Sequence, residues 1–146
     1  MQKIEEIALS KLILDENYCR QVLPFVKEEY FDTINHKILF EVVHKYVQEF
    51  DGLPEPMALK IEIEKRKDIS EEILKEIEGF IDTGLDKDQY NHDWLLSTTE
   101  KWCKERAVYL ALMTAISIHQ GDDTTLGTES IPSILTDALA AVSYTH

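Results

Sequence analysis

The side chains best suited to chemistry are five histidines, two cysteines and 28 acidic residues. His36 and His44 would lie roughly 12 Å apart along one helix, too far to share a metal ion. His92 and Asp93 could be a pair of metal ligands, but we interpret them as residues at the start of a helix. The chain contains no His-Glu-x-x-His or Cys-x-x-Cys pattern. We therefore predict no metal site.

The sequence also gives no support for acid–base or nucleotide chemistry. Adjacent carboxylates occur at helix starts or in loops, where they favour the helix dipole or face water: Glu5-Glu6, Glu28-Glu29, Glu71-Glu72 and Asp122-Asp123. Catalysis would need one carboxylate of a pair held in a desolvating pocket. The five glycines are scattered, and none belongs to a phosphate-binding loop or to a Gly-x-Ser-x-Gly turn. We predict no catalytic residue and no cofactor site in this chain.

The charge balance argues against direct nucleic-acid binding. Acidic residues outnumber basic ones by 28 to 15, a formal charge of −13, whereas affinity for DNA or RNA depends on neutralising phosphates. A basic turn at Lys60, Lys65, Arg66 and Lys67 is largely cancelled by nearby glutamates. The acidic surface suits encounters with basic partner proteins.

Two tryptophans need a separate interpretation. Trp94 and Trp102 are eight residues apart on one expected helix, with Arg106 a further turn on. Their side chains could stack on bases or on a partner, but we interpret them as part of a core stripe.

The composition predicts one soluble, all-α domain. The chain has 146 residues, of which 44% are apolar, and glycine and proline are scarce. A chain of this length needs no disulfide or metal to fold. Cys19 and Cys103 are far apart and predict reduced thiols in a cytoplasmic compartment. No apolar run is long enough for a membrane span, and the start does not resemble a signal peptide.

Apolar periodicity and capping signals predict helices over residues 3–14, 17–22, 34–50, 56–66, 70–81, 94–120 and 130–142. Residues 28–32 should form a tight connection whose aromatic pair enters the core. We expect Gly52 to be the left-handed cap of its helix, Ser70 and Asp93 to be N-caps, and Gly121 to end the long helix. The chain would thus form a helical globule over residues 1–90 and an antiparallel helical hairpin over residues 91–146.

The hairpin carries the main functional hypothesis. Residues 107–118 are apolar nearly all round, so the helix must be covered on every side. One short partner helix cannot do this, and we expect another subunit to cover the rest. The candidate hairpin-core or oligomer-interface residues are Val108, Tyr109, Leu112, Met113, Ile116, Ile118, Ile134 and Leu139.

Several short segments, taken in order, resemble a known family. They are IALSKLILD at 7–15, VLPFV at 22–26, EEYF at 28–31, HKILF at 36–40 and GLP at 52–54, followed by HDWLL at 92–96, ERA at 105–107 and IPSIL at 131–135. Together they resemble the N-terminal domain of DnaB-type replicative DNA helicases, and more closely the branch from T4-like bacteriophages. The cellular proteins usually have glycine where Ser10 stands, which also favours the phage branch.

The resemblance implies a role in a larger machine. It implies a hexameric collar in which hairpins of neighbouring copies pair, and in which the domain helps to dock primase and the helicase loader. The RecA-like motor, with its ATP and Mg, would follow C-terminal to this chain, and single-stranded DNA would be bound only by the full-length ring. We therefore expect a truncated, cytoplasmic, non-membrane domain.

Two other functions remain open at this stage. A free-standing phage adaptor that binds a replication or host factor would show the same helices and hairpin. A small helical enzyme is the third alternative, and it would need a pocket formed by His92, Asp93 and Trp102.

Overall fold

All the regular structure in the described part of the chain is helical. The structure, a computed structural model, describes residues 2–121 and 126–140. These residues form α1 (Gln2–Leu14), α2 (Glu16–Val22), α3 (Ile34–Phe50), α4 (Pro56–Glu64), α5 (Glu71–Gly79), α6 (His92–His119) and α7 (Ile131–Ala140). Short 3-10 turns, η1 (Leu23–Phe25), η2 (Glu28–Tyr30) and η4 (Thr128–Ser130), and a π-helical turn, η3 (Phe80–Gly84), extend or join them. The all-α prediction is confirmed. Helix α7 is described as far as Ala140, and the predicted end at Val142 lies outside the described residues.

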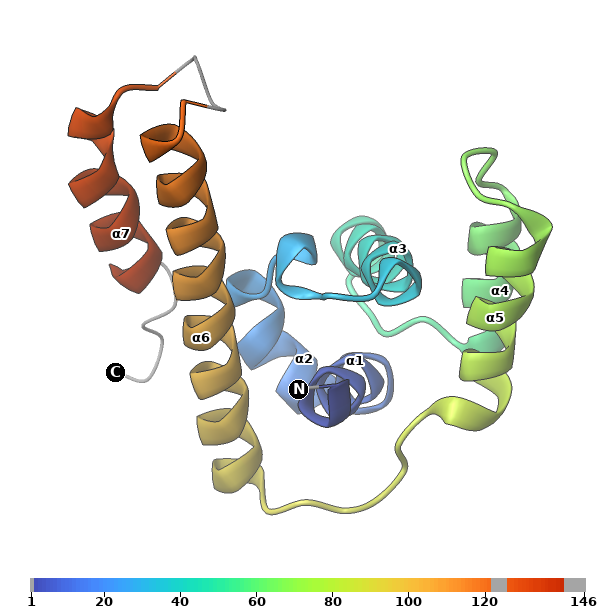
Figure 1. The fold of residues 1–146 in the computed structure, drawn as a ribbon. Coiled ribbons are helices and arrows are strands. Elements are labelled where there is room, and N and C mark those ends of the chain that lie inside the picture. The colour runs from blue at the N-terminus through green and yellow to red at the C-terminus, as the bar shows by residue number, and fades with distance from the viewer. Residues whose placement is uncertain (1, 122–125, 141–146) are drawn as a thin grey trace.

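The helices are arranged around α1 and α2 at the centre (Figure 1). Helix α3 packs against α1, and the pair α4–α5 lies on the far side of α3. Residues 85–91 cross from that pair to the start of α6, which passes α1 and α2 and continues beyond them. Helix α7 runs antiparallel beside the second half of α6. This is the expected globule and hairpin, while the division of the chain at residue 90 stays a prediction.

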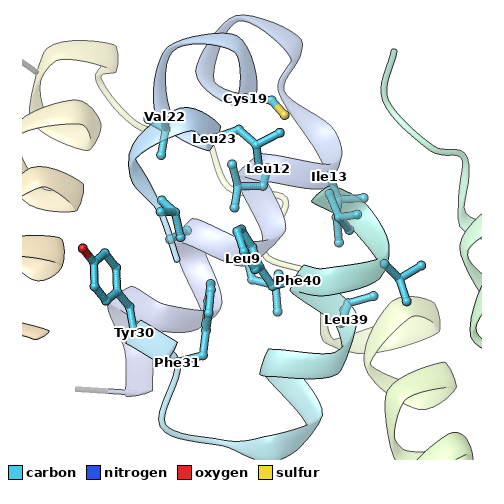
Figure 2. Packing of buried hydrophobic residues seen from close by; sticks show 14 of the residues in the cluster. Leu9, Leu12, Ile13, Cys19, Val22, Leu23, Tyr30, Phe31, Leu39 and Phe40 are labelled. Carbon is cyan, nitrogen blue, oxygen red and sulfur yellow. The ribbon is translucent and has the colours of Figure 1, made fainter. Parts of the chain in front are cut away.

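The core lies where α1, α3 and the connection at residues 28–32 meet. Leu9 and Leu12 of α1 are fully buried, and Figure 2 shows them among side chains from α2 and α3. The centroid of the Phe31 ring lies 5.1 Å from that of Phe40 and 5.2 Å from that of Trp102 of α6. Burying a side chain of this size contributes about 1.5–3 kcal/mol. The expectation that the aromatic pair Tyr30 and Phe31 enters the core is confirmed.

Side-chain caps define several helix starts. The Ser70 hydroxyl accepts a hydrogen bond from the backbone N–H of Ile73 at 3.2 Å, as predicted. The cap of α6 was assigned to Asp93, and that prediction is wrong. The Asn91 side chain accepts from the backbone N–H of Trp94 at 2.9 Å, so the helix begins at His92. Asparagine and aspartate are about equally good caps, and the sequence alone does not separate two candidates this close together.

The C-terminal cap of α3 also differs from the prediction. Asp51, not Gly52, takes the left-handed conformation, with φ of 52°. Aspartate is one of the few non-glycine residues that visit this region, because its short side chain bonds locally. Gly121 does have the expected positive φ, of 81°, just beyond α6.

The expectation that the adjacent carboxylates face water is wrong for Glu5. Its side chain is 2% exposed. It accepts hydrogen bonds from His36 Nδ1 at 2.7 Å and from the backbone N–H groups of Asp32 at 3.1 Å and Thr33 at 3.4 Å. Glu5 thereby ties α1 to the start of α3. Burial raises the pKa of the Glu5 carboxyl, but these hydrogen bonds outweigh it and hold the pKa below its ordinary value.

The cap of α3 gives a paired prediction. Asp51→Gly should raise the free energy of unfolding by about 0.5–1 kcal/mol, because glycine adopts a positive φ without steric cost. Gly52→Ala should not lower it, since Gly52 has no positive φ and its Cβ would meet only the Phe50 carbonyl oxygen at 3.9 Å. Denaturant unfolding of both variants tests the assignment. A loss of stability in Gly52→Ala together with no gain in Asp51→Gly would show that glycine is the left-handed cap.

Glu5 gives a prediction about pH. A depressed pKa contributes stability above the unfolded-state value, and that stability is lost as the pH falls through the folded-state value. At neutral pH, the free energy of unfolding of Glu5→Gln should therefore be about 1–3 kcal/mol lower than that of the wild type. This difference should shrink below about pH 4.5. Urea melts across the acid range measure it, with the exposed neighbour Glu6→Gln as control. Parallel pH profiles for Glu5→Gln and the wild type would contradict the role given to Glu5.

Candidate functional site

The described residues offer no cluster suited to a metal ion, and the candidate pocket at the start of α6 is not assembled. They contain no group of three or more His, Cys, Asp and Glu side chains able to hold a metal ion. His92 Nε2 lies 2.8 Å from the Gln21 side-chain oxygen. Trp102 is buried roughly 15 Å further along α6. The pocket of His92, Asp93 and Trp102 that a small enzyme would need is therefore not formed.

Neither cysteine is placed for nucleophilic chemistry. Cys19 and Cys103 are both free and buried. Burial raises the pKa of Cys19 to about 11 and that of Cys103 to about 12. A thiol is reactive only as its thiolate, so both side chains act as small core residues.

The basic turn is neutralised by its neighbours. Arg66 donates to Glu41 at 3.0 Å and to Asp68 at 2.6 Å, and Lys65 Nζ lies 2.7 Å from Glu62. Lys60 pairs with Asp82 of η3. Three of the four cations already have acidic partners, and Lys67 alone adds little positive charge for a phosphate backbone.

One face of α6 is covered in its first half and open in its second. Leu95, Trp102, Tyr109 and Ile116 follow one another at seven-residue intervals, a spacing that keeps them on the same side of a helix. Leu95 and Trp102 are 2% and 4% exposed, because the globule packs on them. Tyr109 and Ile116 are 50% and 47% exposed. These four side chains are apolar, but the globule ends before the second half of the face.

Helix α7 covers a different side of α6. Ala107, Ala111, Ala115 and Ile118 form a buried row with small side chains over most of its length. Ala107 and Ala111 line a hollow of about 250 Å³ whose opposite wall includes Ile134 and Ala138 of α7. Helical geometry places this row roughly 150° around α6 from the open face. The intramolecular hairpin therefore leaves the open face uncovered.

We call the open face the hairpin stripe and define it as Tyr109, Leu112, Met113 and Ile116, each 47–50% exposed. The other predicted interface residues lie elsewhere. Leu139 of α7 is 58% exposed, Val108 and Ile134 are half-buried, and Ile118 is buried within the chain. Contact between copies through any of these residues stays a prediction.

Arg106 holds the stripe to the globule, a role that the sequence analysis missed. Its Nε donates to the backbone carbonyl of Tyr30 at 2.6 Å, and its guanidinium lies 5.0 Å over the Tyr109 ring. The spacing of three residues between Arg106 and Tyr109 on one helix is the signal that could have suggested the stacking.

The interpretation of both tryptophans as core is half correct. Trp102 is buried beside Phe31, whereas Trp94 is 47% exposed at the start of α6. Eight residues turn the helix by about 80°, so Trp94 points away from the globule that buries Trp102 and the neighbouring Leu95.

Comparison with known proteins gives one informative relative. No protein-family model matches the chain. The chain is 31% identical over 113 residues to a DnaB-like replicative helicase of Enterobacteria phage T4. The match covers 77% of this chain but 23% of that helicase, so the chain spans less than a quarter of its relative. Among the described helices, none is long and apolar enough to cross a membrane. The match relates the chain to a replicative helicase of a bacteriophage.

Proposed function

We propose that this chain is the N-terminal collar domain of a hexameric, ATP-dependent replicative DNA helicase. In this proposal the domain supports assembly of the ring and docks primase and the helicase loader. The motor, with its ATP and Mg, and the contacts with single-stranded DNA belong to the rest of the helicase. The proposal rests on the match to the phage helicase, which covers most of this chain and a minor part of the relative.

The hairpin stripe is the observation that carries the assembly role. Soluble monomers expose scattered apolar side chains, but a contiguous apolar strip on one helix marks an interaction site. The hairpin stripe continues the face of α6 whose earlier residues, Leu95 and Trp102, are buried by the globule. A second copy of the chain would cover the part of this face that the globule leaves exposed. Two copies related by a two-fold axis can present the same strip to each other.

The expected strength of this contact follows from the exposed area. Covering a half-exposed side chain of this size is worth about 1 kcal/mol, so two copies that each bury the stripe gain roughly 8 kcal/mol. Association costs about 4–15 kcal/mol in lost freedom. The gain and the cost are similar, so the isolated domain should pair weakly and depend on concentration. A stable ring would need further contacts.

Docking of other replication proteins is supported by charge. The formal charge of −13 suits basic partners and would speed their encounter. The same charge opposes direct contact between this domain and DNA, consistent with a role in assembly rather than in translocation.

Charge placed in the stripe tests the proposal. Leu112→Glu and Ile116→Glu should abolish self-association, because each would bury an unpaired carboxylate between copies. Ile61→Glu is the matched control, since Ile61 is an aliphatic residue of α4 with 48% exposure. Light scattering coupled to gel filtration, at high protein concentration, gives the mass of each species. Wild type and stripe variants that are equally monomeric, or a control that dissociates as much, would contradict the proposal.

A further inference from the structure

A stacked aromatic pair lies at the start of α6. The rings of Tyr90 and Trp94 are 5.4 Å apart between centroids and inclined by 25°. Trp94 remains 47% exposed. We call this pair the aromatic shelf. It lies at the opposite end of α6 from the hairpin stripe, and the inference below does not rest on the proposed role in ring assembly.

The shelf is fixed in place by buried and charged groups. The Tyr90 hydroxyl donates to Asp86 Oδ2 at 2.7 Å, and Lys11 Nζ lies 5.4 Å over the Tyr90 ring. The backbone N–H of Trp94 is held by the Asn91 cap. The shelf is therefore organised before any partner arrives, which lowers the entropy cost of binding.

The irregular segment that carries Tyr90 is itself fastened to α1. The Ser10 hydroxyl, fully buried, accepts from the backbone N–H of Asp86 at 2.8 Å. Lys11, which is 8% exposed, donates to the Asp88 carbonyl at 2.6 Å. A surface segment held by two buried polar side chains has a defined conformation, as binding loops on rigid scaffolds do.

A hollow of about 420 Å³ lies alongside, within the size range of ligand sites. Tyr90, Leu14 and Leu95 form its apolar lining. Its charged lining contains three acids, Asp15, Glu16 and Asp88, and two lysines, Lys11 and Lys87. Asp15 caps α2 and Glu16 pairs with Arg20, which leaves the Asp88 carboxylate for a cation of a partner. The shelf and the adjoining hollow therefore combine an exposed aromatic ring, an aliphatic wall and a carboxylate.

We propose that the shelf and its hollow bind an extended, arginine-bearing segment of a partner protein. One guanidinium stacks flat on the exposed indole of Trp94. Neighbouring side chains of the same segment enter the hollow beside Tyr90, where one pairs with Asp88 and an aliphatic stem lies along Leu14. Arginine is favoured over lysine because its planar group both stacks and bonds to carboxylates in a fixed geometry. The acids disfavour a nucleic-acid strand, although its bases could also stack on tryptophan.

The test uses a fluorescein-labelled peptide of alternating glycine and arginine, titrated with the full chain while anisotropy is recorded. Trp94→Ala should weaken binding about fivefold or more, and Trp94→Phe should retain it within about twofold. Phe50→Ala, which removes an exposed aromatic ring at the end of α3, should have no effect. Circular dichroism reports whether each variant is folded.

Charge reversal gives a second arm that leaves the rings intact. Asp88→Lys should weaken the peptide about fivefold, whereas Glu71→Lys, with the same change in net charge on exposed α5, should change it less than about twofold. Equal effects of these two variants would reduce the interaction to non-specific attraction and overturn the proposal. It is also overturned if the wild type does not bind, if Trp94→Ala binds normally, or if oligothymidylate displaces the peptide.

Discussion

Helix α6 is longer than the globule that supports it, and this mismatch governs the whole structure. In its first half, Leu95 and Trp102 are buried against the body of the protein. Seven and fourteen residues further on, Tyr109 and Ile116 continue the same face with nothing from the described part of the chain fully covering them. An apolar face on a rigid helix is stabilised only when another surface covers it and removes it from water. The uncovered half is thus the natural place for a second protein surface.

The rest of the fold keeps that face in a fixed position. Glu5 joins α1 to α3, and Arg106 joins α6 to η2 through the carbonyl of Tyr30 while it lies over the ring of Tyr109. Helix α7 lies beside the second half of α6 (Figure 1). It covers the buried row of Ala107, Ala111, Ala115 and Ile118 and stiffens α6 from another side. A side chain presented on such a support loses little conformational entropy when it is buried by a partner. This is the property expected of a domain whose work is assembly.

Much of this could be predicted from the sequence, since helix periods and caps are local. The bounds of α3, the Ser70 cap and the aromatic pair at residues 30–31 follow from neighbouring residues. The misses depend on tertiary geometry. The sequence pattern gives Trp102 and Tyr109 the same expected burial, because it does not show where the globule ends along α6. Glu5 resembles any helix-start carboxylate until the fold brings His36 to within 2.7 Å. Asp51 and Gly52 are adjacent candidates for one left-handed position, which only the structure assigns to Asp51.

The central claim is that the open face of α6 is covered by another copy of the chain. Mixing a ¹³C-methyl-labelled sample with an unlabelled one, at high concentration, allows NMR to detect contacts between copies alone. The account predicts intermolecular nuclear Overhauser effects at the methyl groups of Leu112, Met113 and Ile116. It predicts none at Met57 or Ile61 of α4, which are at least as exposed. Intermolecular effects that are absent from α6, or that appear only on α4, would contradict it.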